Sequence, residues 1–199
     1  MSENVLIRPV NEKDSASLLQ IYAPFIRETD ITFEYDVPSV QEFADRISSV
    51  TKRYPWLVCE SDGKVIGYAY ASRHSERTAY QWSVNVSVYV KPEHHGKHLA
   101  TALYTALFEI LRRAGYFNAY ACITTPNVKS EGFHQAFGFK PIGVFNNVGF
   151  KFGKWKSVRW FEYALSALSS DPQKPKPVYE VIAQEDLQKI LEKAENILK

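Results

Sequence analysis

The segment from Trp82 to Ala106 constrains the fold most, because a strand-like run leads through a short basic turn into an amphipathic helix. Residues 83–90 read SVNVSVYV, a composition typical of a buried strand. Pro92 ends the run because proline has no amide hydrogen for a ladder. From residue 99 to 111 apolar residues recur every three or four positions, which predicts a helix that stops at Gly115. Such a turn leaves the first helical amides unpaired, and they readily bind phosphate.

The turn itself matches neither of two common phosphate-binding motifs. Gly96-Lys97 lacks the upstream glycine and the following Ser or Thr of a Walker loop, and the chain has no GxGxxG near it. On spacing alone, an ordinary strand-to-helix turn is therefore the favoured interpretation.

Length and charge narrow the class of protein. The 199 residues suit one domain with an appendage. With a net charge of +2, the chain lacks the strongly basic character of nucleic-acid-binding proteins, so we expect no nucleic-acid partner. Neither a membrane span nor a signal peptide is visible, so we expect a cytoplasmic protein without a membrane partner. Cys59 and Cys122 lie in strand-like runs and are expected to be buried thiols of a reducing cytosol.

The order of the expected elements indicates an α/β (α+β) fold. We expect strands at 5–10, 56–59, 65–71, 79–90 and 119–124, around Val144, and at 158–164. We expect helices at 14–27, 39–50, 99–114 and 127–137. Asp14 is expected to cap the first helix and Pro24 to kink or break it near Ala23. Residues 149–155, GFKFGKW, read as a connection between the last two strands.

The character of the chain changes after residue 165. Residues 1–165 are expected to form the domain, 166–177 a polar Pro-rich linker without packing of its own, and 178–199 a helical appendage. The appendage helix is too short to be stable alone, so it should dock. Docking on its own domain and a role in dimerisation both stay open.

Residues 95–100, HGKHLA, resemble the pyrophosphate loop Q/R-x-x-G-x-G/A of the GNAT acyltransferase superfamily, with His in place of two of its residues. RYPWLV at 53–58, RTAYQW at 77–82, FHQAFGF at 133–139 and GFKFGKW at 149–155 are similar to segments of phosphinothricin-type N-acetyltransferases. The resemblance covers roughly residues 5–165. It implies a GNAT fold, with a central mixed sheet flanked by helices, and transfer of acetyl from acetyl-CoA to a small-molecule amine. The implied amine is an amino acid or an analogue of the phosphinothricin or methionine sulfoximine type.

The resemblance also implies where acetyl-CoA binds. The strand around Val88, Tyr89 and Val90 would take the pantetheine arm. The loop residues that would form the pyrophosphate site are His95, Gly96, Lys97, His98, Leu99, Ala100 and Thr101. Asn127 would bond the CoA arm, cap a helix, or do both. His98 replaces a motif glycine, and its Cβ would obstruct the phosphate or its imidazole would bind it; the sequence leaves this open.

For the amine, the resemblance implies Phe33, Arg77, Tyr80 and Lys151 as substrate-binding residues. Arg77 is favoured as a carboxylate anchor because its planar fork suits bidentate contact; an exposed arginine without an anion partner is the alternative. His134 matches a family histidine that would give a proton to the departing thiolate, and a buried packing histidine is an equal alternative.

The most consequential departure is Asn85, where the resembling family usually has a glutamate base. An amide can only orient a water. Losing a general base costs roughly 10²–10⁴ in rate, although positioning of the reactants supplies much of the acceleration. A slow enzyme, a neutral substrate, or another base such as Glu34 or His134 would each account for Asn85.

Two other functions are alternatives for this chain. Glu93, His94, His95 and His98 could suggest a metal, but Pro92 and Gly96 keep them off one helical face, so no metal is expected. A GNAT-fold module that binds acyl-CoA without turnover is the stronger rival. We expect direct attack by the amine without an acetyl-enzyme, with the oxyanion held by a backbone N–H of the central strand. By analogy with relatives, we also expect a homodimer.

Overall fold

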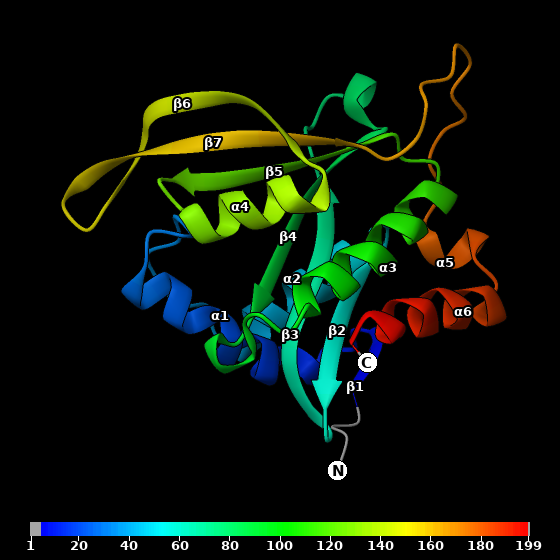
Figure 1. Ribbon diagram of the computed structural model, residues 1–199, viewed down its shortest axis with the longest axis horizontal. Coiled ribbons are helices and arrows are strands. Elements are labelled where there is room, and N and C mark those ends of the chain that lie inside the picture. The colour runs from blue at the N-terminus through cyan, green and yellow to red at the C-terminus, as the bar shows by residue number, and fades with distance from the viewer. Residues whose placement is uncertain (1–4, 199) are drawn as a thin grey trace.

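A mixed sheet organises residues 5–198, the part of the chain that the computed structural model describes (Figure 1). Its seven strands run in the order β1-β2-β3-β4-β5-β7-β6, and every neighbouring pair is antiparallel except β4 and β5. The strands are β1 (Val5–Pro9), β2 (Trp56–Ser61), β3 (Lys64–Arg73), β4 (Ser83–Val90), β5 (Asn118–Thr125), β6 (Lys140–Lys151) and β7 (Lys154–Ala164). The α-helices are α1 (Ser15–Glu28), α2 (Val40–Thr51), α3 (Leu99–Arg113), α4 (Val128–Phe137), α5 (Val178–Val181) and α6 (Gln184–Glu195). The predicted order of the elements through β7 is confirmed.

The parallel pair β4–β5 joins only at its start. Ser83 to Asn85 pair with Asn118 to Tyr120, and beyond these residues the two strands share no ladder. Residues of both strands beyond this point, such as Ser87 and Cys122, line one cavity. The sheet therefore opens into a cleft directly after Asn85.

Two hydrophobic cores hold the sheet, one on each face. Alternate side chains of β2 supply both, as the two-residue period of a strand requires. Leu57 and Cys59 join the core under α3, whereas Trp56 and Val58 join the core under α1 and α2. These cores fix β3 and β4, and hence one wall of the cleft.

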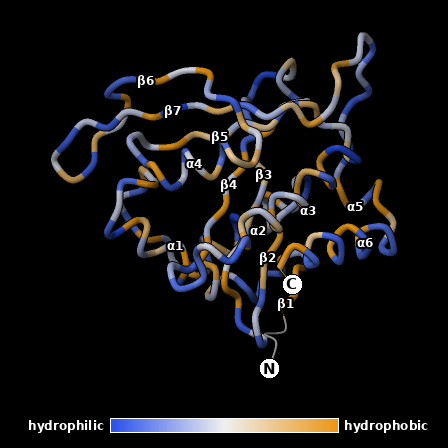
Figure 2. The backbone as a smooth tube through the Cα atoms, viewed as in Figure 1, coloured by the Kyte–Doolittle hydropathy of each residue, from blue (hydrophilic) through white to orange (hydrophobic). Residues whose placement is uncertain are grey.

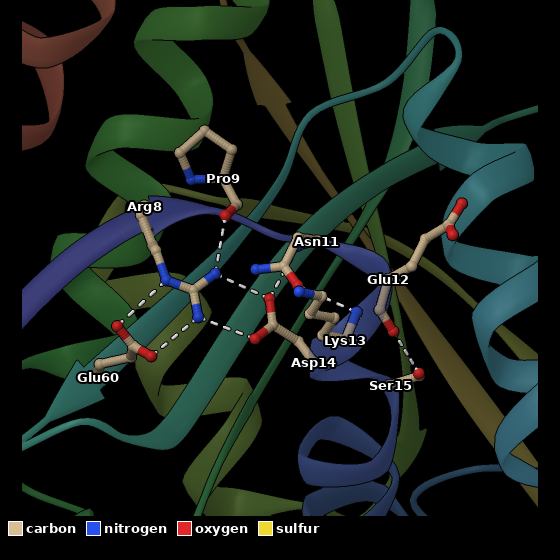
Figure 3. A network of polar contacts seen from close by, with 8 residues as sticks. All are labelled: Arg8, Pro9, Asn11, Glu12, Lys13, Asp14, Ser15 and Glu60. Carbon is tan, nitrogen blue, oxygen red and sulfur yellow. Dashed lines mark hydrogen bonds and ion pairs between the residues drawn. The ribbon is translucent and has the colours of Figure 1, made fainter.

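A polar network ties the start of the chain to the sheet (Figure 3). The Arg8 guanidinium donates to both carboxylate oxygens of Asp14 at 2.8 Å and to Glu60 at 2.8 and 3.1 Å. Burial by itself would raise the pKa of Asp14, but the hydrogen bonds from Arg8 and from the Asn11 amide outweigh it and hold that pKa below its usual value. Asp14 therefore makes no cap bond to α1, contrary to the prediction, because Arg8 and Asn11 occupy its oxygens.

Two further local predictions need correction. Thr78–Tyr80 is a 3-10 turn and β4 begins at Ser83, because Tyr80 and Gln81 bond back to Arg77 and Thr78. α1 runs through Pro24 without a break, since Pro24 lies on the exposed face where the lost hydrogen bond is tolerated, and the alternative of a kink stays a prediction.

The last two strands run on to a tight turn rather than a loose connection. Phe152 and Gly153 both have positive φ, as a two-residue hairpin turn requires, so most of residues 149–155 belongs to strands. Cys59 is buried as expected. Cys122 is exposed, because β4 no longer pairs with β5 at that point.

The C-terminal segment packs against the rest of the chain. Ile190, Leu191 and Ala194 of α6 are buried in the core that contains α3, and hydrophobic and hydrophilic residues alternate along this helix (Figure 2). Glu195 accepts a 2.7 Å hydrogen bond from the Ile7 amide on the edge strand β1. Of the two alternatives for the helix, docking on its own domain is the one present.

The segment 166–177 also has packing of its own, contrary to the prediction. The Trp82 indole donates to the Gln173 carbonyl at 2.9 Å, and the Lys176 amide donates to the Ala114 carbonyl at 3.1 Å. The division of the chain at 165 and 177 stays a prediction.

Candidate active site

A cavity of about 590 Å³ lies where β4 ends and α3 begins. Its walls include the β4 residues Val88, Tyr89 and Val90, the segment from His94 to Thr101 without Lys97, and Asn127 and His134 from the α4 region. Most of the predicted CoA-binding residues are thus brought together around one space.

The start of α3 has the backbone geometry of an anion site. Its first helical hydrogen bond runs from the Ala102 amide to the His98 carbonyl, so the amides of the first turn have no helical partner. No side chain caps this end. The dipole of the 15-residue helix adds positive potential at the same place.

Two residues before α3 adopt left-handed conformations. Gly96 has φ +78°, and His98 has φ +60° where the resembling family has glycine. Histidine is among the non-glycine residues enriched in this region. The loop therefore keeps a glycine-like backbone despite the substitution, and the exposed His98 side chain lines the cavity. Whether His98 assists or obstructs phosphate stays open.

His95 and Asn127 hold the cavity walls in place. The His95 Nε2–H donates to the Val90 carbonyl at 3.0 Å, which fastens the loop to the end of β4. Asn127 Oδ1 accepts from the Ser130 amide at 3.1 Å, so the predicted helix cap is present. Its side-chain NH₂ group makes no hydrogen bond in the described part of the chain. The group can therefore donate to a bound molecule while Oδ1 caps the helix.

His134 is buried, only 5 % exposed, between α4 and α3. Its Nδ1 lies 2.8 Å from the Ser130 carbonyl, which can only accept, so Nδ1 carries the proton. Its Nε2 then accepts from the Tyr104 hydroxyl at 3.3 Å. Burial lowers the pKa of His134 below its ordinary value. In this arrangement the neutral ring directs no N–H into the cleft, and the role of proton donor stays a prediction.

Asn85 contacts a histidine that the sequence analysis missed. His74 Nδ1 lies 2.9 Å from Asn85 Oδ1. The His74 ring stacks on Tyr120 with 4.5 Å between centroids and meets the rings of Tyr80 and Trp160 at an angle. These residues come from four separate segments, and no spacing in the sequence could have indicated the contact.

Glu34, the other predicted alternative base, is engaged elsewhere. Its carboxylate forms an ion pair with Arg46 at 2.8 Å and accepts from the Tyr22 hydroxyl at 3.1 Å. Burial is the main cause that raises the pKa of Tyr22 to about 12, so Tyr22 is a neutral donor here. The geometry gives Glu34 a place in holding the 29–37 loop to α1 and α2.

The predicted substrate-binding residues occupy two places. Phe33 packs against Gly149 of β6 so closely that a Cβ there would lie 2.3 Å from its ring. Lys151 is 2 % exposed and donates to the Thr32 carbonyl at 2.7 Å, while burial lowers its pKa. Lys151 thus joins the hairpin tip to the 29–37 loop.

Arg77 and Tyr80 lie instead in the turn between β3 and β4. Arg77 is exposed, and its guanidinium pairs with no described residue. Tyr80 is 46 % exposed and contacts His74. These two side chains are accessible to a ligand.

No metal site forms from the histidine-rich loop. Across residues 5–198, no three His, Cys, Asp or Glu side chains come together as metal ligands would. The expected absence of a metal stays a prediction.

Comparison with known proteins agrees with this geometry. Residues 7–160 match the model of the acetyltransferase (GNAT) domain. The chain belongs to the GNAT acetyltransferase family. It is 33 % identical over 177 residues to a phosphinothricin N-acetyltransferase of Streptomyces viridochromogenes. The alignment covers 89 % of this chain and 96 % of the relative.

Two further relatives extend the comparison. An L-methionine sulfoximine/L-methionine sulfone acetyltransferase of Salmonella typhimurium is 30 % identical over 160 residues, covering 80 % of this chain and 94 % of the relative. The crystal structure of a GNAT phosphinothricin acetyltransferase from Sinorhizobium meliloti in complex with AcCoA superposes with a TM-score of 0.81 at 32 % identity. It covers 88 % of this chain and 96 % of that one.

The predicted family, fold and enzyme class are confirmed: this GNAT member is an acetyl-CoA-dependent N-acetyltransferase. The cavity fits the cofactor, because an open helix N-terminus and an unpaired edge of β4 meet at its walls. No helix among residues 5–198 has the length and apolar character of a membrane-crossing segment.

Proposed function

We propose that this enzyme acetylates the primary amine of an amino acid or of an amino-acid analogue of the phosphinothricin or methionine sulfoximine type. The observation that carries the proposal is the exposed Arg77, which lies in the same turn as Tyr80 and His74, and His74 contacts Asn85, where β4 and β5 separate. A guanidinium can hold a carboxylate through two hydrogen bonds while aromatic rings cover the side chain. The relatives named above act on amino acids of this kind.

The cofactor lies along β4 and α3 in this proposal. The open edge of β4 at Val88, Tyr89 and Val90 accepts the pantetheine arm as an added strand would be accepted. The amides from Gly96 to Thr101 receive the pyrophosphate, and Asn127 bonds the arm. The thioester then points toward Asn85, where β4 and β5 separate.

The reaction is a direct attack. The amine nitrogen, once deprotonated, bonds to the carbonyl carbon of the thioester, a β4 amide holds the developing oxyanion, and the carbon–sulfur bond breaks. The nitrogen loses its extra proton, the thiolate takes one up, and CoA leaves. Cys122 is exposed to the cleft, yet the partial desolvation of its sulfur by the cleft walls raises the pKa of the thiol to about 11, which disfavours an acetyl-cysteine intermediate.

We include a cytoplasmic homodimer in the proposal. The β6 edge strand exposes a row of large apolar side chains that a second copy would cover, namely Ile142, Val144, Phe145, Val148 and Phe150. Light scattering after size-exclusion chromatography should give twice the mass of 22.8 kDa. Phe145→Asp should shift it to the monomer, whereas a monomeric wild type would refute this part.

The substrate test measures CoA release with a panel of amines. It contains phosphinothricin, methionine sulfoximine, methionine sulfone, ordinary amino acids and polyamines, each paired where available with the same amine lacking its carboxylate. We expect turnover with carboxylate-bearing amines and at least a tenfold rise in KM for them in Arg77→Gln. The amines without a carboxylate and the exposed control Lys52→Gln should show no such rise. Turnover confined to polyamines would contradict the proposal.

A further inference from the structure

The absence of a glutamate at position 85 leaves the reaction without an evident base, and the turn after β3 brings another candidate to the same place. We propose that His74, oriented by Asn85, is the general base that deprotonates the substrate ammonium. The inference rests on the acetyl transfer to an amine proposed above. It names the residue that takes the proton in that reaction.

The hydrogen bonds around Asn85 settle which way its amide points. The Asn85 Nδ2 group lies 3.4 Å from the Arg73 carbonyl, which can only accept. The NH₂ group must therefore face Arg73, and Oδ1 must face His74. The positions of the amide oxygen and nitrogen are thus assigned from their hydrogen-bond partners.

The same network fixes the tautomer of His74. Asn85 Oδ1 can only accept, so the 2.9 Å contact requires a proton on His74 Nδ1. The neutral ring then carries its lone pair on Nε2. No described residue hydrogen-bonds that nitrogen, so it is left to take a proton. An asparagine thus does for this histidine what a carboxylate does in other histidine-based sites: it holds the ring and its tautomer.

The position of the pair fits the reaction. Asn85 and Tyr120 are the last residues that β4 and β5 pair before the cleft opens. Ser87 and Cys122 lie two residues further along, on the same side of their strands, and both line the cleft. Two residues of a strand span about 6.6 Å, so the His74 ring, which contacts both Asn85 and Tyr120, lies next to the start of the cleft.

The other predicted bases are less available than His74. The Glu34 carboxylate is held by Arg46 and Tyr22. Both ring nitrogens of His134 are engaged, by Ser130 and by Tyr104. Among the three, only His74 keeps an unengaged acceptor.

Several titratable or charged groups face His74 from the elements around it. Tyr80 comes from the β3–β4 turn and Tyr120 from β5, with Glu162 of β7 opposite Tyr120. The ion pair of Arg73 and Glu76 lies on the same turn as His74. Burial is the main cause that raises the pKa of Tyr120, so this ring stays neutral near pH 7.

The proposed step moves two protons and one acetyl group. His74 Nε2 takes the first proton from the ammonium, and the freed nitrogen pair forms the bond to the carbonyl carbon. The carbon–sulfur bond breaks with its electron pair on sulfur, and the nitrogen gives up its second proton, which neutralises the thiolate directly or through water. The imidazolium, stabilised through Nδ1–H by Asn85, returns its proton to water.

The kinetic test compares His74→Phe with the wild type. Phenylalanine keeps the stacking on Tyr120 and removes the base. We expect kcat/KM to fall roughly 10²–10⁴-fold, the acid limb of its pH profile to disappear, and the loss to shrink at high pH, where the amine is already neutral. Acetyl-CoA affinity and the unfolding midpoint should not change. In the His74→Phe background, Asn85→Glu should restore part of the rate.

A second measurement needs no turnover. Nitrogen-15 chemical shifts of the neutral His74 ring should show Nδ1 protonated and Nε2 unprotonated, and Asn85→Ala should mix the two tautomers. A proton on Nε2 in the wild type would overturn the inference even if every amine tested proved inert. An unchanged rate and pH profile in His74→Phe would overturn it while leaving the proposed acetyl transfer intact. So would a rate loss that only follows a loss of acetyl-CoA affinity.

Discussion

The two ends of the cleft are built in different ways. The end proposed for the cofactor is built mainly from backbone amides, a helix dipole and one strand edge, between Val88 and Thr101. The end proposed for the amine is built from side chains of separate segments, including His74, Asn85 and Tyr120. A site made of backbone accepts a change of side chain, as the left-handed His98 shows. A site made of side chains changes its chemistry when one of them changes, as at Asn85.

The largest effect of a single new charge is expected at the cofactor end. Thr101→Glu places a carboxylate in the first turn of α3, inside the cavity. It should weaken acetyl-CoA binding roughly 10- to 100-fold through repulsion of the pyrophosphate, as calorimetry can measure. The helix itself should gain about 0.3–1 kcal/mol, because acids favour a helix N-terminus.

Thr105→Glu, one turn further along the same helix, is the matched control and should leave binding unchanged. Equal binding by Thr101→Glu and the wild type would mean that the backbone of this turn does not hold the cofactor, and the contrast between the two ends would fail.

The next prediction concerns the support of the amine end. Lys151→Met keeps the volume of the buried side chain but leaves the Thr32 carbonyl without its bond. We expect a loss of about 1–3 kcal/mol in the free energy of unfolding, with a higher KM for the amine and unchanged acetyl-CoA affinity. Urea denaturation and steady-state kinetics measure both effects.

The exposed neighbour Lys154 supplies the control, since Lys154→Met should be silent. A higher amine KM in Lys151→Met without any loss of stability would instead assign Lys151 direct contact with the substrate, as the sequence analysis predicted.

A third prediction uses the pH dependence of His134, which lies between the two ends. Burial lowers the pKa of His134 in the folded protein. As the pH falls below the ordinary histidine value of about 6.5, the unfolded chain therefore takes up a proton before the folded protein does. Its contribution to stability is therefore full above that pH and declines as the pH falls.

His134→Asn should be less stable than the wild type at pH 8, and the gap should narrow toward pH 5. Chemical denaturation at both pH values measures it. A gap that widens in acid would mean that His134 is charged in the folded protein, which would favour its role as a proton donor.

The smallest effect is expected at His98. A non-glycine residue in a left-handed conformation costs roughly 1–2 kcal/mol of stability, which glycine would recover. Glycine also raises the conformational entropy of the unfolded chain, and this offsets part of the recovered stability. His98→Gly should therefore stabilise the protein by about 0.5 kcal/mol, measurable as a small rise in the melting temperature. Unchanged acetyl-CoA binding would show that the backbone alone serves the phosphate. Weaker binding would show that the imidazole contributes.

The sequence was most informative where neighbours in the chain make the site. The alternation of β4, Pro92 and the periodicity of α3 predicted the strand, turn and helix, because these patterns act through local backbone geometry. The helix predicted from residue 39 is present for the same reason, because the local capping box of Ser39 and Glu42 starts it. Predictions failed where distant groups competed, as when Arg8 took the carboxylate of Asp14 from the helix end.

By itself, the sequence determined the family and the order of the elements, and it predicted where the cofactor loop lies. The family resemblance also predicted that the usual base is missing, because Asn85 stands at its position. Only the tertiary structure decided what stands beside Asn85, because the pairing of β3 with β4 and of β4 with β5 brings His74 and Tyr120 to it from other parts of the chain. Hydrogen bonds between such side chains depend on register and packing, and neither leaves a pattern in the local sequence.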